Sequence, residues 1–327
     1  MRLDRMDVTL DHWPLRQPFR FAGFNVAVLD TVTVTVAAQG KSGWGEGVAP
    51  VVFDITAEQA ATELEGLRSA CLSGDALAAC ASLPPGPARN ALDCALWDLR
   101  AKLTGESIWH LAGLAAGPAA LTVDQSIGLA SPEAMAAAAQ ASNHAVLKLK
   151  MDQTLVPERL AAVRAARPDA EIIIDANQSW PRDFIESLLP ALARLGIAMI
   201  EQPVRRGADE TLRGLQSPIA IFADESCHTS ADLTRLAPLY QGVNIKLDKT
   251  GGLTEALALA HAARAHGLGL MVGCMAGTSL SMAPAYVIAS LCRWADLDGP
   301  LLIAHDRAHP MRYAQGQLQH FAPALWG

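Results

Sequence analysis

The sequence predicts an α/β protein, a modified (β/α)8 barrel of the TIM type that is preceded by a smaller α+β domain. Eight short apolar runs alternate with helical patterns after about residue 120, which is typical of parallel strands joined by crossover helices. The runs are LTVDQSIG, AVLKLK, EIIIDAN, IAMIEQP, IAIFADES, VNIKLDK, LGLMVGC and RWADLDGP. From the second run onward, the residues that end the runs recur every 22 to 28 positions, about the length of one βα unit.

The residues before the barrel predict a sheet followed by helices. Residues 28–38 alternate at a period of two, so we expect an antiparallel strand with one solvated face. The glycine-rich stretch 41–47 is expected to end that strand. Two helices follow, the first with Thr56 as its N-cap and the second bracketed by Pro87 and Gly105. Strands followed by helices indicate a separate α+β domain.

These patterns divide the chain into three parts. We expect a capping domain over residues 1–115, a barrel with the functional residues over 116–305, and a C-terminal segment, 306–327, that returns to the capping domain. A length of 327 residues is large for one compact core and suits a barrel with an accessory domain. A hydrophobic content of 51% can fill such a core.

The composition excludes several classes of protein. A net charge of −7, with no basic run longer than two residues, argues against a nucleic-acid surface. The N-terminus is charged where a signal peptide is apolar, and no uncharged apolar stretch approaches the roughly 20 residues that span a bilayer. Six cysteines without CxxC spacing are expected to be reduced packing thiols. We therefore expect a cytoplasmic protein with a small-molecule partner.

Three acids, Asp175, Glu201 and Asp224, follow three consecutive apolar runs. Carboxylates that converge on one rim of a barrel repel one another unless a cation lies among them. Oxygen ligands without a neighbouring His or Cys favour a hard ion, so we expect one Mg²⁺ per chain. Asn177 and Glu225 are close enough in sequence to serve as further ligands. The alternative is that the acids cap the following helices, but their occurrence at three successive strand ends favours the metal site.

Three lysines complete the expected reaction centre. Lys148 and Lys150 share one face of the second strand, and Lys246 ends the sixth, which lies opposite in an eight-stranded barrel. Lys150 and Lys246 would flank a substrate, one removing a proton next to a carboxylate and the other returning a proton to the opposite face. We expect Lys148, a second cation, to lower the pKa of Lys150. An exposed strand end is the alternative for the pair. Lys249 is expected to be a loop residue or to pair with a carboxylate rather than to act as a base.

The last two runs supply further candidate binding residues. Asp296 and Asp298 share one face of the eighth strand, where two acids would suit a substrate ammonium group. A turn or helix cap at the DGP sequence is the alternative. The seventh run ends at Cys274 among small residues, so a substrate could approach the backbone closely there.

The motifs KLK, DANQSW, EQP, ADESCHT, VNIKLDKTGGL and ADLDGP resemble those of the enolase superfamily. Within it, the chain is similar to the muconate lactonizing enzyme subgroup and its dipeptide epimerases, over nearly the whole length. The resemblance implies an isomerase with Lys150 and Lys246 as acid/base catalysts and Mg²⁺ on the three acids. It also implies that Lys148 contacts the substrate carboxylate, that Asp296 and Asp298 hold the α-ammonium group of a dipeptide, and a role in cell-wall peptide metabolism. The oligomeric state stays open, a homo-oligomer included.

Two departures from that pattern bear on the substrate. Epimerases that act on L-Ala-D/L-Glu carry an arginine in a capping-domain loop, but the stretch after Arg20 has none and offers Phe21 and Phe24 instead. The first strand in that family usually ends with a substrate-contacting Thr, for which we expect Asp124 here. An apolar lid would favour an apolar side chain, and Asp124 a polar or cationic one.

Other reactions remain as alternatives. N-acylamino-acid racemization, o-succinylbenzoate synthesis and muconate cycloisomerization belong to the same subgroup. Their substrates lack a free ammonium group, so Asp296 and Asp298 argue against them. A non-catalytic metal-binding barrel is the alternative from another class, and the complete set of expected acids and bases argues against it.

Overall fold

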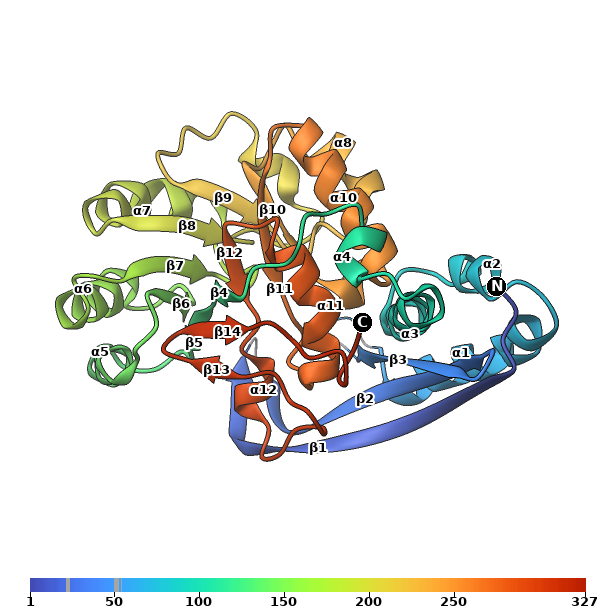
Figure 1. Ribbon diagram of the computed structural model, residues 1–327. Helices are drawn as coiled ribbons and strands as arrows, with labels where there is room; N and C mark the ends of the chain where they lie inside the picture. The colour runs from blue at the N-terminus through green and yellow to red at the C-terminus, as the bar shows by residue number, and fades with distance from the viewer. Residues whose placement is uncertain (22–23, 50–52, 54) are drawn as a thin grey trace.

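The computed structural model describes residues 1–21, 24–49, 53 and 55–327, with side chains for all of these but 19–21, 24 and 25. The expectations for Arg20, Phe21 and Phe24 therefore lie outside the described side chains. Figure 1 shows a curved N-terminal sheet with its helices beside a larger barrel. The elements of this first domain are β1 (Arg5–Phe21), β2 (Phe24–Ala38), β3 (Lys41–Val48), α1 (Ala57–Ser73), α2 (Ala76–Ser82), α3 (Pro87–Thr104) and α4 (Ile108–Leu111).

The barrel consists of eight parallel strands in the sheet order β12-β11-β10-β9-β8-β7-β6-β5, and β12 lies next to β5. Every one of the eight predicted runs overlaps one of these strands, so the predicted fold class is confirmed. The strands are β5 (Asp124–Ile127), β6 (Val146–Lys150), β7 (Glu171–Asp175), β8 (Ile197–Glu201), β9 (Ala220–Ala223), β10 (Gly242–Ile245), β11 (Gly269–Gly273) and β12 (Trp294–Asp296).

Helices on the outside of the barrel join most of these strands. They are α5 (Pro132–Ala141), α6 (Val156–Ala166), α7 (Arg182–Arg194), α8 (Leu233–Leu236), α9 (Leu247–Thr250), α10 (Leu253–Ala265) and α11 (Ser279–Ala289). The short helix α12 (Gly299–Leu302) follows the last barrel strand and contacts β1. The described connection from β8 to β9 has only a 3-10 helix, η2 (Asp209–Leu212), where the alternation predicts a full helix. A small antiparallel sheet joins β4 (Ala120–Thr122) to β13 (Tyr313–Ala314) and β14 (Gln317–Gln319).

The predicted helix ends of the capping domain are confirmed. The Thr56 side chain accepts a hydrogen bond from the backbone N–H of Gln59 at the start of α1. Pro87 occupies the first turn of α3, and Gly105 ends that helix with a left-handed φ of 71°. Proline has no N–H to lose in a first turn, and glycine adopts positive φ without steric cost, so both residues define the helix.

Strand β2 departs from the expected single solvated face. Thr31 and Thr33 are buried although they alternate with the valines of the core. Trp13 Nε1 donates to Thr31 Oγ1 at 3.1 Å, and Arg307 Nη2 donates to Thr33 Oγ1 at 2.7 Å. Residues distant in the sequence thus cover this face, which a local alternation pattern does not reveal.

The glycine-rich stretch 41–47 was expected only to end the preceding strand. It instead forms most of a further strand, β3. A Cβ atom on Gly45 would lie 2.7 Å from the backbone nitrogen of Ala95 in α3, and Cβ atoms on Gly43 and Gly47 would overlap backbone carbonyl oxygens of the same helix. The alternating glycines therefore allow the α3 backbone to lie directly against the strand. Sequence reasoning misses this because glycine is more often a turn residue.

Replacing Gly45 with alanine is therefore expected to destabilise the protein by about 3 kcal/mol, because the new methyl group has no free space between two backbones. The control is Gly66→Ala in the middle of α1, where a Cβ meets nothing within 4 Å and alanine should stabilise the helix slightly. Denaturant unfolding of both variants measures the difference. Equal stability of the two variants would contradict the packing argument.

The capping domain is fixed to loops that follow two barrel strands. Glu46 of β3 accepts hydrogen bonds from the backbone N–H and the hydroxyl of Thr278, at 2.8 and 2.6 Å. Asn90 of α3 donates to Asp248 at 2.7 Å, two residues after Lys246. These contacts place the capping domain over the carboxyl ends of the strands.

The C-terminal segment contacts both parts of the chain. Arg307 forms ion pairs with Glu46 at 2.6 Å and with Asp11 at 2.9 Å, and Trp326 Nε1 donates to the carbonyl of Cys94 at 3.1 Å. Strand β14 pairs with β4 on the barrel side. We retain the boundaries 1–115, 116–305 and 306–327 as a proposal that these contacts support.

Two further expectations concern the whole chain. All six cysteines are free thiols, and the four buried ones, Cys71, Cys80, Cys94 and Cys227, fit the expected packing role. No helix in the described ranges has both the length and the apolar character that crossing a membrane requires.

Candidate active site

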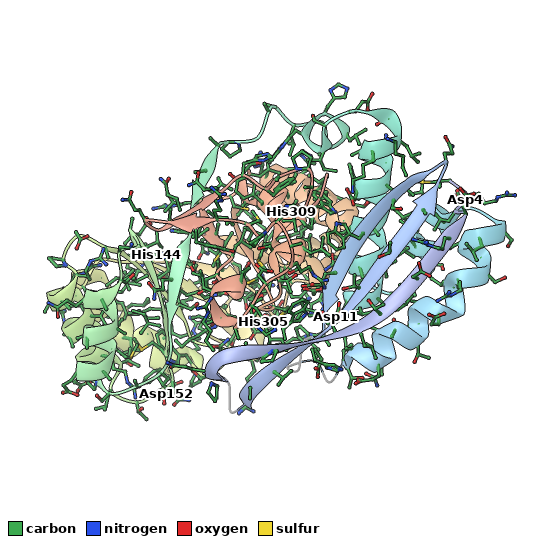
Figure 2. The ribbon with its side chains drawn as sticks, turned by 60° about the horizontal axis from the view of Figure 1, so that its bottom comes forward. Asp4, Asp11, His144, Asp152, His305 and His309 are labelled. Carbon is green, nitrogen blue, oxygen red and sulfur yellow. The ribbon has the colours of Figure 1, made fainter. Side chains whose placement is uncertain are left out.

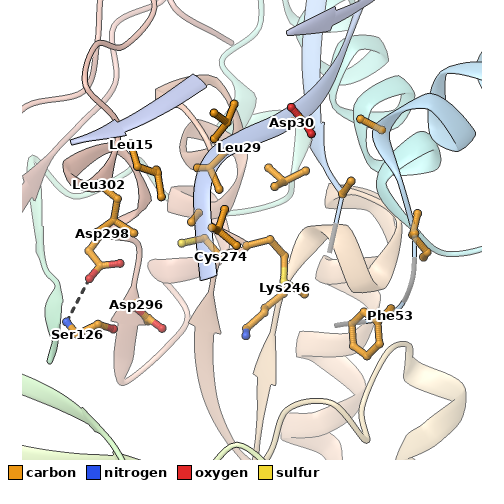
Figure 3. A pocket seen from close by; sticks show the side chains of 18 of the residues that line it. Leu15, Leu29, Asp30, Phe53, Ser126, Lys246, Cys274, Asp296, Asp298 and Leu302 are labelled. Carbon is orange, nitrogen blue, oxygen red and sulfur yellow. Dashed lines mark hydrogen bonds between the residues drawn. The ribbon is translucent and has the colours of Figure 1, made fainter. Parts of the chain in front are cut away.

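A cavity of about 300 Å³ lies between the capping domain and the carboxyl ends of the barrel strands. Its barrel side is polar, with Lys150, Lys246, Asp296 and Asp298 among the lining residues. Its capping-domain side is mostly apolar, and Figure 3 shows Leu15 and Leu29 above the polar groups. The position agrees with the rim on which barrel enzymes build their active sites.

The three acids predicted as metal ligands end adjacent strands. Asp175 and Glu201 are direct partners in the ladder of β7 and β8, and Asp224 follows β9. All three are at most 2% exposed. Burial of three carboxylates on neighbouring strand ends requires positive charge nearby.

Each acid is paired with a lysine. Lys150 Nζ lies 2.6 Å from Asp175 Oδ2, Lys148 Nζ lies 2.8 Å from Glu201 Oε2, and Lys246 Nζ lies 2.7 Å from Asp224 Oδ2. Because β6 and β10 are four strands apart in the sheet order, Lys150 and Lys246 approach the cavity from opposite sides. The predicted juxtaposition of the two lysines is present.

The pairing sets the charge state of these groups. Burial raises the pKa of Asp175, but Lys150 and Lys148 outweigh it and lower the value to about 2. Burial, followed by repulsion from Asp175, raises the pKa of Glu201 to about 8. Burial lowers the pKa of Lys246, but attraction to Asp224 outweighs that effect and raises it above its ordinary value. Near neutral pH, Asp175 is therefore held as a carboxylate and Lys246 as an ammonium group, whereas Glu201 favours its protonated form.

Lys148 lies in the buried part of the site. Its side chain is fully buried and does not line the cavity, and its Nζ also lies 2.6 Å from Asp296 Oδ2. Burial lowers the pKa of Lys148, but Asp296, Glu201 and Asp175 together raise it well above its ordinary value. Lys148 therefore links the acids of β7, β8 and β12, and the expected contact with a substrate carboxylate stays a prediction.

The donor set fits a hard cation. Asp175, Glu201 and Asp224 offer only oxygen atoms, and Glu225 Oε2 beside them is buried with no hydrogen-bond partner among the described residues. Glu201 Oε2 is within 2.8 Å of Lys148 Nζ, but the contact lacks hydrogen-bond alignment, so this oxygen also has a free lone pair. The three acids lean toward their lysines, and the one trio of described acids with oxygens within 4.8 Å of one another lies elsewhere. A cation at this site would take up the charge that the lysines now balance.

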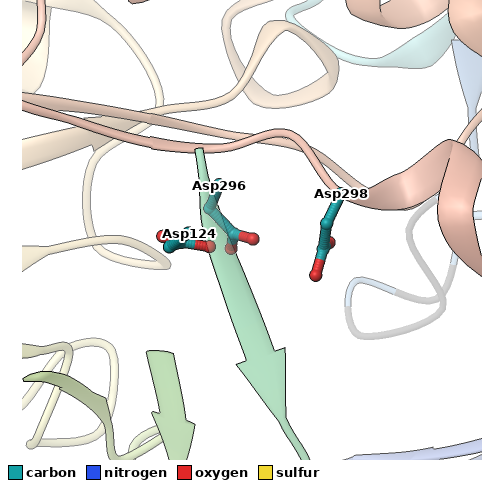
Figure 4. Close-up of side chains that lie close together, drawn as sticks. All are labelled: Asp124, Asp296 and Asp298. Carbon is teal, nitrogen blue, oxygen red and sulfur yellow. The ribbon is translucent and has the colours of Figure 1, made fainter. Parts of the chain in front are cut away.

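That other trio consists of Asp124, Asp296 and Asp298, which Figure 4 shows together. Asp298 Oδ2 accepts a hydrogen bond from the backbone N–H of Ser126 at 3.1 Å, and both Asp296 and Asp298 line the cavity. Asp124 does not line it and is only 1% exposed. The structure therefore corrects the expected substrate contact at Asp124: Ser126, two residues further on the same face, is the lining residue of β5.

Sequence reasoning missed two residues of the site. Ser126 is the register partner of Lys148, and Asn244 donates from Nδ2 to Glu201 Oε1 at 2.7 Å. Both precede a strand end by one or two positions and share the inward face of their strand, and that period-two relation is the signal that could have found them. Lys249 pairs with Asp224 Oδ1 at 2.6 Å, as expected, and Cys274 lines the cavity after β11.

A parallel barrel with paired lysines and acids at its rim, covered by an α+β domain, defines an enolase-like protein. Residues 5–113 match the model of the mandelate racemase / muconate lactonizing enzyme N-terminal domain, and residues 132–319 match that of the enolase C-terminal domain-like family. The chain belongs to this mandelate racemase / muconate lactonizing enzyme family. The family resemblance expected from the motifs is thereby confirmed.

Individual relatives match over almost their entire length. An N-acetyl-D-glutamate racemase of Pseudoalteromonas sp. is 40% identical over 300 residues, which cover 90% of this chain and 95% of that protein. The L-Ala-D/L-Glu epimerase of Escherichia coli is 40% identical over 318 residues, covering 94% of this chain and 96% of that protein. The crystal structure of a dipeptide epimerase of Methylococcus capsulatus, complexed with Mg and L-Arg-D-Lys, has a TM-score of 0.90 at 32% identity, covering 100% of this chain and 99% of that one.

Proposed function

We propose that this protein is a Mg²⁺-dependent dipeptide epimerase that inverts the α-carbon of the C-terminal residue. The observation that carries the proposal is the position of Lys150 and Lys246 on opposite sides of one cavity, with three buried acids between them. An inverting proton transfer needs a base on one face of the carbon and an acid on the other. The relatives that act on dipeptides support the same reaction.

The lysines and acids around the cavity have separate roles in the proposed reaction. One lysine removes the α-proton at its Nζ atom, and the other delivers a proton from its Nζ to the opposite face of the carbon. Asp296 and Asp298 bind the ammonium group of the dipeptide, and the capping domain excludes water from above. Asp175, Glu201 and Asp224 would hold Mg²⁺, which neutralises the substrate carboxylate and the negative charge that develops when the proton leaves.

N-acylamino-acid racemization is the second candidate, because one of the most similar relatives is an N-acetyl-D-glutamate racemase. Its chemistry at the α-carbon is the same, but an N-acyl substrate brings no ammonium group to Asp296 and Asp298. Both acids are at least nine-tenths buried and line the cavity. Burying two carboxylates beside a neutral acyl group is costly, so the dipeptide is favoured.

Hydrogen exchange in D₂O tests the proposal. The protein with Mg²⁺ is incubated with a panel of L,L-dipeptides and matching N-acetyl amino acids, and NMR or mass spectrometry follows deuterium at the α-carbon. We expect deuterium to enter the C-terminal residue of at least one dipeptide, together with its epimerisation. Exchange with N-acetyl amino acids alone would replace the dipeptide assignment by the second candidate, and exchange with neither would refute both.

Free thiols support a reducing compartment, and we propose a cytoplasmic location on that basis. A place in cell-wall peptide metabolism depends on the dipeptide that the panel identifies.

A further inference from the structure

Asp124 is a buried acid without a visible partner. It is 1% exposed, and neither of its carboxylate oxygens has a hydrogen-bond partner among the described residues. Its oxygens lie within 4.8 Å of those of Asp296 and Asp298, and Figure 4 shows it beside Asp296. Burying a carboxylate without a hydrogen-bond partner reduces the stability of the folded protein, so its presence beside a binding cavity indicates a function.

The surroundings of the three acids supply too little positive charge. Lys148 contacts Asp296 at 2.6 Å, but it also pairs with Glu201 and Asp175. The Tyr313 hydroxyl beside the group donates to the carbonyl of Leu297 instead.

Two of the three acids, Asp124 and Asp298, favour their protonated forms when no ligand is bound, whereas Lys148 outweighs the effect of burial and lowers the pKa of Asp296 below its ordinary value. Burial raises the pKa of Asp124 well above its ordinary value, and repulsion from Asp296 adds to this. Burial and the same repulsion raise the pKa of Asp298 to about 7. Lys148 opposes both shifts, and Lys150 opposes that of Asp298. The Cys274 thiol, just after β11, and the Tyr313 hydroxyl are further titratable groups that face Asp298.

We propose that Asp124 is a specificity-determining residue, which makes the subsite of Asp296 and Asp298 demand a cationic ligand group and so selects free dipeptides over N-acylated amino acids. This inference rests on the proposed function and goes beyond it, because it assigns the selectivity to a third acid beneath the two that line the cavity. Asp124 acts through its neighbours, since it does not itself reach the cavity.

The selectivity follows from charge balance. An ammonium group placed at Asp296 and Asp298 supplies a positive charge that the acids lack, and a proton held by the group is released as it binds. A neutral acyl group supplies no charge, so the acids must keep their protons while losing contact with water. Specificity then arises from the penalty on the wrong ligand as much as from attraction to the right one.

Two ligands that differ only in the ammonium group test the proposal: L-Ala-L-Glu and N-propionyl-L-Glu. Calorimetric titration in the presence of Mg²⁺ gives the ratio of their dissociation constants. We expect Asp124→Asn, which removes the acid and keeps the shape, to narrow that ratio about tenfold. The matched control is Asp30→Asn at the cavity wall, where the acid is half exposed and paired with His12, and where the ratio should not change. An unchanged or wider ratio in Asp124→Asn would overturn the inference.

Wild-type protein gives a second readout that needs no variant. Titrations at pH 7 in two buffers of different ionisation enthalpy count the protons released on binding. We expect release with L-Ala-L-Glu and none with N-propionyl-L-Glu, and equal values would also overturn the inference. The two proposals can fail separately. If the wild-type protein epimerises dipeptides but Asp124→Asn leaves the ratio of the two dissociation constants unchanged, the role of Asp124 is refuted. If the protein discriminates between the two ligands but epimerises no dipeptide, the epimerase function is refuted.

Discussion

Replacing Lys150 or Lys246 by alanine is expected to lower the rate of epimerisation at least about 10³-fold. We propose each lysine as the group that exchanges a proton with the substrate on its own side of the cavity, and inversion needs both. The two acids paired with them, Asp175 and Asp224, are also the proposed cation ligands. A cation held by these acids would take up part of their charge, so that a lysine could act as a base.

The two variants should differ in which epimer they still exchange. A single remaining lysine can remove and return the α-proton on its own face without inverting the carbon. Lys150→Ala should therefore exchange deuterium into one epimer of the dipeptide, and Lys246→Ala into the other. NMR of separately supplied L,L- and L,D-dipeptides in D₂O measures this. Full epimerisation by either variant, or exchange of the same epimer by both, would refute the two-base assignment.

Lys150→Arg separates acid/base chemistry from charge alone. A guanidinium keeps the positive charge beside Asp175 but does not give up its proton in proteins. We expect this variant to be as inactive as Lys150→Ala. Recovered activity would mean that Lys150 acts through its charge and that the proton is carried by another group.

Much of this arrangement could be read from the sequence because barrel chemistry is tied to strand ends. Each apolar run predicts a strand, and the residue that follows it must lie on the rim. Asp175, Glu201 and Asp224 therefore converge on neighbouring strands as predicted, and Lys246 lies across the barrel from Lys150. These positions depend only on strand order and on the period-two alternation of side chains.

What failed depends on register and on contacts between distant residues. Asp124 pairs with Val146 in the ladder, two residues before Lys148 on the neighbouring strand. It therefore begins β5, whereas the prediction placed it at the end of that strand. Lys148 forms ion pairs with Glu201 of β8 and Asp296 of β12, which lie far along the chain, so no local pattern indicates them. A local pattern gives the face on which a side chain lies but not its depth in the barrel or its partner.

Replacing Glu201 by glutamine is the second change with a large expected effect, and its sign should depend on Mg²⁺. Glu201 is the central acid of the three and is fully buried, and burial together with Asp175 raises its pKa to about 8. When the pKa of a carboxyl group is higher in the folded than in the unfolded protein, the protein loses stability as the pH rises from the unfolded to the folded pKa. Without metal, the neutral glutamine should therefore make the protein more stable above pH 5, with the largest gain near pH 8 and above.

With Mg²⁺ the order should reverse. A ligand present at 100 times its dissociation constant stabilises the folded protein by about 2.7 kcal/mol. Glu201→Gln should lose most of this stabilisation by Mg²⁺ and should also lose activity. Thermal unfolding of both proteins in EDTA and in MgCl₂ measures the four stabilities. Glu171→Gln, at the opposite end of β7 from Asp175, serves as the control and should keep the full increment. An equal increment in Glu201→Gln and in the wild type would exclude Glu201 as a metal ligand, because a buried acid that merely balances Lys148 has no reason to couple stability to a divalent cation.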